Sequence, residues 1–214
     1  MSLKHISAAC LMALAASAAQ PLPELRVEPT AGGSVFYVKN GSPEPLTAYL
    51  IELVDYPGSY YALWQDEVSA PIAPGAEKRI QIANMTVGAV PDYVKMQAAL
   101  YADGSSSGIP EKVTQLVERR RFTLQTTREL IGRLEKAQAA GTAKASVIAD
   151  LKQWAESMQP QGRPNRNSQA TINQAAARSL ISDTAAGLDA HSIAETLAGL
   201  RASERALAAS KPAL

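Results

Sequence analysis

The sequence predicts an α+β protein in which an antiparallel β-sandwich of six to seven strands precedes a helical region of about four helices. Short segments of alternating polarity, separated by Pro, Gly and Asn, fill residues 24–108, whereas apolar residues recur at helical spacing over residues 109–214. Nine of the eleven aromatic residues precede Glu111. We therefore expect two structural units that differ in composition.

The sandwich is predicted from six segments with the period-2 alternation of half-buried strands. They are residues 25–28, 34–39, 45–55, 60–65, 78–82 and 94–102. In the third segment, Tyr49, Ile51 and Leu53 are expected on one face and Glu52 on the other. In the last segment, four apolar residues are expected on a single side: Val94, Met96, Ala98 and Leu100. No helical stretch separates the segments, so antiparallel pairing is expected.

Three sequence features carry a family resemblance: Val-Lys-Asn-Gly-Ser at residues 38–42, Pro-Leu-Thr-Ala-Tyr at residues 45–49, and the Pro74–Gly75 turn before an alternating strand. With these features the chain resembles the immunoglobulin-like sandwiches of exported bacterial proteins. It also resembles exported bacterial proteins of unknown function in which the sandwich ends in a strand, an Asp-Gly turn and a basic helix, here residues 100–104 and 118–121. The resemblance implies a fold and an exported address, but no known activity.

Apolar stripes with steps of three, four or seven residues predict the helices. The first three are expected over residues 111–140, 143–158 and about 169–186, with a loop at about 159–168. A fourth begins after Ser192, where the sequence Ser-Ile-Ala-Glu forms a capping box. Since each stripe needs a partner surface, an antiparallel bundle beside the sandwich is expected.

Residues 1–19 have the composition of a secretory signal. Lys4 and His5 form a short basic start, an apolar stretch too short to span a bilayer follows, and small residues allow cleavage after Ala18 or Ala19. Residues 20–23 then form an extended lead-in. We expect an exported protein, periplasmic or secreted, with no transmembrane helix in the mature chain.

Cleavage of the signal is expected to close off most metal and cysteine chemistry. The only cysteine is Cys10, and of the two histidines only His191 follows the predicted cleavage point. A mature chain of this composition has no thiol nucleophile and no disulfide, and one histidine is a poor basis for a zinc site. We therefore expect no cofactor and no metal.

The segment Gly104–Gly108 matches the G-x-S-x-G pattern of serine hydrolases, with Ser106 as nucleophile. Asp150 or Asp183, followed by His191, even fits the order of a hydrolase triad. The pattern requires a parallel α/β sheet and a helix that begins at once, and neither is predicted here. A polar turn between two elements is the favoured interpretation.

Four aromatic residues are the candidates for ligand or partner contacts: Tyr56, Tyr60, Tyr61 and Trp64. On a strand Tyr60 and Trp64 share a face, and exposed rings there could stack on a sugar or hold a partner protein. The competing interpretation, which we favour, places Trp64 in the sandwich interior, as is common in such folds.

The run Arg119–Arg121 could bind nucleic acid or anionic lipid. Consecutive helical residues are turned by about 100°, so the three arginines do not form one stripe, and the chain as a whole has a formal net charge of only +1. The charge is unevenly divided, with −5 over residues 20–110 and +5 over residues 111–214. Contact of the basic helix with the acidic sandwich, or plain solvation, is therefore expected, and nucleic acid is not expected as a partner.

The sequence thus favours an exported, non-enzymatic binding or envelope scaffolding protein that acts through contacts with a protein or envelope partner. The alternative is a carbohydrate-binding module with an exposed aromatic face, and a more distant one is a serine hydrolase at Ser106.

Overall fold

The computed structural model describes residues 20–55, 61–83, 91–159, 165 and 168–213. The predicted signal at residues 1–19, as well as Tyr56 and Tyr60, lies outside the described residues. The strands are β1 (Glu24–Thr30), β2 (Gly33–Lys39), β3 (Leu46–Leu53), β4 (Ala62–Asp66), β5 (Glu77–Ala83), β6 (Val94–Tyr101) and β7 (Ser106–Gly108), with a 3-10 turn, η2 (Pro91–Tyr93), before β6.

The strands form two antiparallel sheets, one with the order β1-β2-β5 and the other with the order β4-β3-β6-β7. This arrangement confirms the predicted α+β sandwich. The partition matches that of immunoglobulin-like folds, where the first, second and fifth strands pair in one sheet and the third, sixth and seventh in the other. Here β4 pairs with β3 and so extends the second sheet.

The core between the two sheets is built mainly from the inward-facing residues of β2, β3 and β6. Phe36, Tyr49, Ile51 and Tyr101 are fully buried there. The prediction that Tyr49, Ile51 and Leu53 share one face is confirmed, because all three belong to this cluster.

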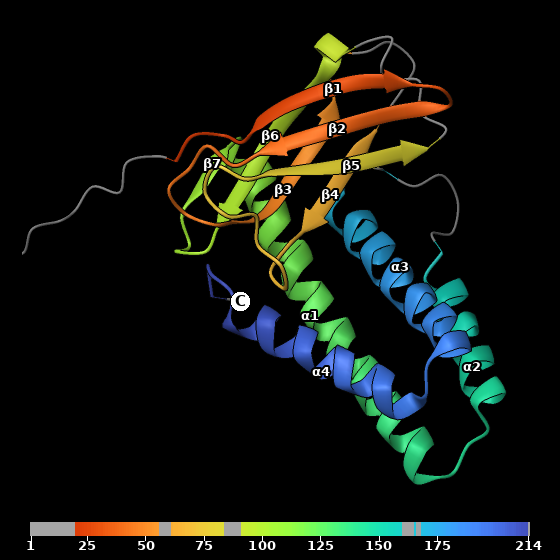
Figure 1. The fold of residues 1–214 in the computed structure, drawn as a ribbon. Coiled ribbons are helices and arrows are strands. Elements are labelled where there is room, and N and C mark those ends of the chain that lie inside the picture. The colour runs from red at the N-terminus through yellow and green to blue at the C-terminus, as the bar shows by residue number, and fades with distance from the viewer. Residues whose placement is uncertain (1–19, 56–60, 84–90, 160–164, 166–167, 214) are drawn as a thin grey trace, which may run out of the picture.

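The outer face of the second sheet is also buried, because the first helix packs across it (Figure 1). Ala48, Leu50 and Leu100 on that face contact Leu116 of the helix. Glu52 lies on the face opposite Tyr49 and Ile51, as predicted, but the helix buries it there, and it forms an ion pair with Lys112.

The prediction that the alternate residues of β6 lie on a single side is wrong. Leu50 and Ile51 are neighbours in β3 but oppose Ala98 and Met96, so Gln97 is an extra residue in β6. Such a β-bulge reverses the alternation of side chains that follow it. Accordingly, Val94 and Met96 face the core between the sheets, whereas Ala98 and Leu100 face the helix.

The helices are α1 (Pro110–Ala139), α2 (Lys144–Ser157), α3 (Gln169–Ala190) and α4 (Ile193–Ala209). They run alternately away from and back toward the sandwich, as expected for an antiparallel arrangement (Figure 1). The capping box is confirmed, since the Ser192 hydroxyl accepts from the Glu195 amide and the Glu195 carboxylate accepts from the Ser192 amide.

The helices form an open array and not a closed bundle. α2 packs against α3, α3 against α1, and α1 against α4, whereas α3 and α4 have little contact. Leu130 and Leu134 of α1, Ile181 and Leu188 of α3 and Leu197 of α4 share the buried core of this array. Two hollows follow from the open arrangement, one between α1 and α2 and one between α3 and α4.

Candidate functional site

Arg120 fastens the helical array to the sandwich. Its side chain is 0% exposed, and its Nε donates to Asp66 Oδ2 of β4 at 2.8 Å, while its Nη2 donates to Asp66 Oδ1 at 3.2 Å. Nη2 also donates to the Thr47 carbonyl oxygen at 2.9 Å, and Nη1 donates to the Lys211 carbonyl oxygen at 3.1 Å. One guanidinium thus joins β3, β4, α1 and the segment after α4.

The carbonyl that Arg120 binds is made available by a second irregularity in the sheet. Leu46 opposes Tyr101 and Ala48 opposes Leu100, so Thr47 is an extra residue in β3. The carbonyl of such a residue is left out of the regular ladder and needs other donors. The Arg120 guanidinium and the Glu67 amide supply them.

A second ion pair holds the beginning of α1. Lys112 Nζ lies 2.8 Å from Glu52 Oε1, and both side chains are largely buried. Between the two ion pairs, Val113, Leu116 and Val117 pack against the outer face of the sheet. The helix is therefore held by apolar packing with a charged contact on either side.

The three consecutive arginines have separate environments, as their rotation around the helix predicts. Arg120 makes the buried contact with the acidic sandwich, which confirms that expectation for this residue. Arg121 is exposed and pairs with Glu118. Arg119 lines a hollow between the sandwich and α3.

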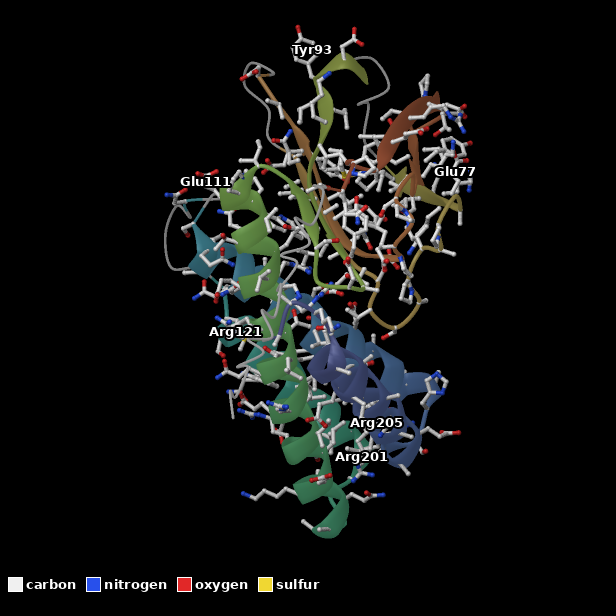
Figure 2. All side chains as sticks on the ribbon, turned by 90° about the vertical axis from the view of Figure 1, so that its left-hand side faces the viewer. Glu77, Tyr93, Glu111, Arg121, Arg201 and Arg205 are labelled. Carbon is white, nitrogen blue, oxygen red and sulfur yellow. The ribbon has the colours of Figure 1, made fainter. Side chains whose placement is uncertain are left out.

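Ion pairs also join α1 to α4. Arg128 Nε lies 2.9 Å from Glu204 Oε1, and Arg201 Nη2 lies 2.7 Å from Glu135 Oε1. Figure 2 shows Arg201 on α4, far from Tyr93 at the opposite end of the molecule. These exposed pairs orient α4 on α1 but contribute little stability each.

The two predicted aromatic residues that the structure describes lie on opposite faces of one sheet. Tyr61 packs into the core between the sheets, where its ring meets that of Phe36 edge to face at 6.2 Å between centroids. Burial raises the pKa of Tyr61 to about 12. Trp64 lies on the outer face and packs against α1. Its predicted place in the sandwich interior is wrong, and it is half-buried and not a fully exposed platform.

Trp64 and Arg119 line the same hollow, which we call the junction pocket. Its volume is about 380 Å³. It is bounded by β4, α1 and the first half of α3, and its lining consists of Ala62, Leu63, Trp64, Arg119, Thr171, Ile172, Ala175, Ala176 and Ser179. Sequence pattern does not predict Arg119 or the α3 residues as neighbours of Trp64, because only the packing of α3 beside β4 brings them together.

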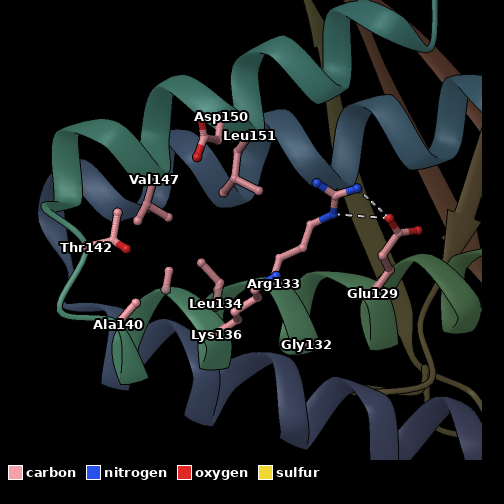
Figure 3. A pocket seen from close by; sticks show the side chains of 11 residues that line it. Glu129, Gly132, Arg133, Leu134, Lys136, Ala140, Thr142, Val147, Asp150 and Leu151 are labelled. Atoms are coloured by element: carbon pink, nitrogen blue, oxygen red, sulfur yellow. Dashed lines mark hydrogen bonds and ion pairs between the residues drawn. The ribbon is translucent and has the colours of Figure 1, made fainter.

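A larger hollow, which we call the α1/α2 groove, has a volume of about 700 Å³ (Figure 3). Leu134, Val147 and Leu151 form its apolar base, and α3 lies behind it. On its rim Arg133 Nη2 lies 2.7 Å from Glu129 Oε1, and its guanidinium stacks 4.1 Å from the ring centroid of Trp154. Arg133 is thereby held in place at one end of the groove.

The segment Gly104–Gly108 has a structural explanation. Gly104 has a φ of +95° in the turn after β6, and Gly108 has a φ of +102° at a point where a Cβ would lie 2.2 Å from the Gln97 carbonyl oxygen. Ser106 lies within β7, opposite Leu100, and not on a turn that leads into a helix. Apart from Gly108, no local pattern in the sequence marks β7.

The structure does not bring the residues of the suggested triad together. Ser106 lies in the sandwich, whereas His191 lies at the turn between α3 and α4, near the far end of the array (Figure 1). Asp183 and His191 line the hollow between α3 and α4, and Asp150 lines the α1/α2 groove.

No protein-family model, curated protein or solved structure matches the chain. In the part of the chain that the structure describes, no helix is both long and apolar enough to cross a bilayer. The same residues contain no group of three or more His, Cys, Asp or Glu placed to hold a metal ion.

Proposed function

We propose that this protein is an exported binding or scaffolding protein that holds an amphipathic helix of a partner protein in the α1/α2 groove. The observation that carries the proposal is the open helical array, which leaves a hollow of about 700 Å³ between two helices that both rest on α3. Grooves of this kind accept a helix that inserts apolar residues at positions i, i+3 or i+4, and i+7.

The dimensions of the groove favour a short helix as its occupant. One wall runs from Glu129 to Ala140 along α1 and its C-cap, a span of about 17 Å at 1.5 Å per residue, which matches about three helical turns. Gly132 and Ala140 are exposed on the rim and let a partner backbone approach closely. Ala137 and Ala140 offer apolar contact, and the almost fully buried Leu134 and Leu151 lie beneath them at the base.

The charges on the rim define the polarity of the partner. Glu129 and Arg133 neutralise each other. Lys136 on α1 and Asp150 on α2 are exposed, and their side chains have no ion pair or hydrogen bond with any residue that the structure describes. A complementary helix would carry an acidic residue toward α1 and a basic residue toward α2.

The buried attachment of the helical array to the sandwich supports a scaffolding role. The buried contacts of Arg120 hold α1 rigidly on the sandwich, and a preformed groove binds with less loss of conformational freedom. The secretory signal predicted at residues 1–19 supports an exported location. Intact-mass measurement of the exported protein tests it, with cleavage expected after Ala18 or Ala19.

Site-specific photo-crosslinking in the native envelope tests the groove. A photoreactive amino acid at Gly132 is expected to capture one protein through an amphipathic helical segment, while the same probe at Gly199 is not. A Cβ added at either glycine would have no other atom within 4 Å, so a side chain can start at each position without a clash.

A synthetic peptide of the captured segment then provides the quantitative test. Its binding to the purified protein is expected to be lost in Gly132→Trp, which fills the groove, and retained in Gly199→Trp, which fills the hollow between α3 and α4. Peptide binding that is equal in the two variants, or a captured segment without an apolar face, would contradict the proposal.

A further inference from the structure

The junction pocket holds a positive charge without a counter-charge of its own. Among the described residues that line it, Arg119 is the only charged one. In the part of the chain that the structure describes, no residue forms an ion pair or hydrogen bond with the Arg119 guanidinium. Burial lowers the pKa of Arg119, although the nearby Asp66 carboxylate opposes this effect. A partly desolvated guanidinium is stabilised by a bound anion.

The acidic group that acts on Arg119, Asp66, is already engaged. Both carboxylate oxygens of Asp66 accept from Arg120, and Oδ1 also accepts from the Val68 amide at 3.3 Å. Arg119 therefore faces the pocket with its hydrogen-bonding capacity available to a ligand. A guanidinium recognises a planar carboxylate through two parallel hydrogen bonds.

The remaining lining supplies two further kinds of contact. Trp64 contributes an aromatic surface, on which the apolar face of a sugar ring can stack. Thr171 and Ser179 of α3 contribute hydroxyl groups: Thr171 Oγ1 accepts from the Ser168 hydroxyl and can donate to a ligand, and Ser179 Oγ donates to Asp183 and can accept from one. Thr171 lies in the first turn of α3, after the Ser168 cap, where the helix dipole also favours negative charge.

We propose that the junction pocket binds a hexuronate, a sugar ring that carries a carboxylate. Arg119 binds the carboxylate, Trp64 packs on the ring, and the α3 hydroxyls bind the sugar hydroxyls. The volume of about 380 Å³ lies at the small end of the range of about 300–1,000 Å³ seen for small-molecule sites. This site is separate from the α1/α2 groove and does not depend on the function proposed for it.

Tryptophan fluorescence provides a direct assay, because the chain contains only two tryptophans. In Trp154→Phe, Trp64 is the only reporter. Titration with D-glucuronate is expected to change its emission saturably, whereas D-glucose, which lacks the carboxylate, and acetate, which lacks the ring, leave it unchanged. Inorganic phosphate is added in a fourth titration to test for a simple anion site.

Substitutions then assign the contacts. In the Trp154→Phe background, Arg119→Gln is expected to weaken glucuronate binding about tenfold or more, the effect of losing a charged hydrogen bond. Arg121→Gln, which changes a neighbouring exposed arginine, should leave the affinity unchanged. Circular dichroism spectra and thermal melting of both variants check that they are folded.

Three results would overturn this inference. The first is no saturable change with D-glucuronate up to about 10 mM, which would fill a site of millimolar affinity. The second is equal binding of phosphate, and the third is binding that survives Arg119→Gln in a folded variant. None of these results bears on peptide binding in the α1/α2 groove, so the two proposals fail independently.

Discussion

Truncation of Arg120 to alanine tests whether one buried guanidinium couples the sandwich to the helical array. The change removes both hydrogen bonds to Asp66 and those to the Thr47 and Lys211 carbonyls. Removing one partner of a buried ion pair costs about 3–5 kcal/mol, because the other charge is left unpaired. Asp66 retains 17% exposure and can be partly rehydrated, so we expect a loss near the lower end, about 3 kcal/mol.

The two tryptophans allow the coupling to be measured in each unit separately. Trp64 reports on the contact between sandwich and α1, and Trp154 on the helical array. In single-tryptophan variants with Arg120 intact, the two urea transitions are expected to coincide. With Arg120→Ala they are expected to separate, because the cooperative unit is broken.

Arg121→Ala is the matched control for this prediction. Arg121 is the next residue on the same helix, but it is exposed, and its pair with Glu118 is worth about 0–1 kcal/mol. If Arg120→Ala costs less than about 1 kcal/mol and the transitions still coincide, the apolar contacts of Leu116 and its neighbours hold the units together, and the reasoning from the buried charge is refuted.

Three further substitutions follow from single contacts. Gly108→Ala is expected to lower the free energy of unfolding by more than about 1 kcal/mol in thermal melts, because its Cβ would clash with the Gln97 carbonyl at a positive φ; an unchanged melting temperature would contradict this. Gly132→Ala is expected to stabilise the protein by about 0.5–1 kcal/mol, since the site is open and helical; destabilisation would show that the glycine is needed for packing. Burial raises the pKa of Tyr61 from 10.0 to about 12, so the unfolded chain loses this proton at a lower pH than the folded protein does. The free energy of unfolding is therefore expected to fall as the pH rises from 10 toward 12. Tyr61→Phe should reduce this alkaline loss in urea melts, and an identical pH dependence would refute the assignment.

The strands can be predicted from local pattern, but their burial cannot. Alternation locates β3 and correctly assigns Tyr49 and Ile51 to one face. Glu52 lies on the opposite face, as predicted, and that face also contains Ala48 and Leu50. Its apolar residues are the signal that a second layer covers the sheet, and the ion pair with Lys112 explains why a carboxylate is tolerated there.

Tertiary contacts decide the features that the pattern misses. β7 is three residues long and contains two serines, so it has no alternation to detect. Its position follows from pairing with β6, and the Gly108 close approach is its only local mark. The bulge at Gln97 likewise leaves no trace in the apolar sequence of β6, yet it turns Ala98 and Leu100 toward α1. One inserted residue thus adds two β6 side chains to the apolar surface on which the helix packs.

For the three consecutive arginines, the sequence predicts their relative directions but not their environments. The turn of about 100° per residue predicts that Arg119, Arg120 and Arg121 point in different directions. It cannot predict which of them is buried, because that depends on the register of α1 on the sheet. The buried position of Arg120 against Asp66 fixes this register, and the same register places Arg119 beside Trp64. The contact that fastens the two units therefore also builds the junction pocket, and Arg120→Ala should weaken any ligand that binds through Arg119, even though Arg120 does not line the pocket.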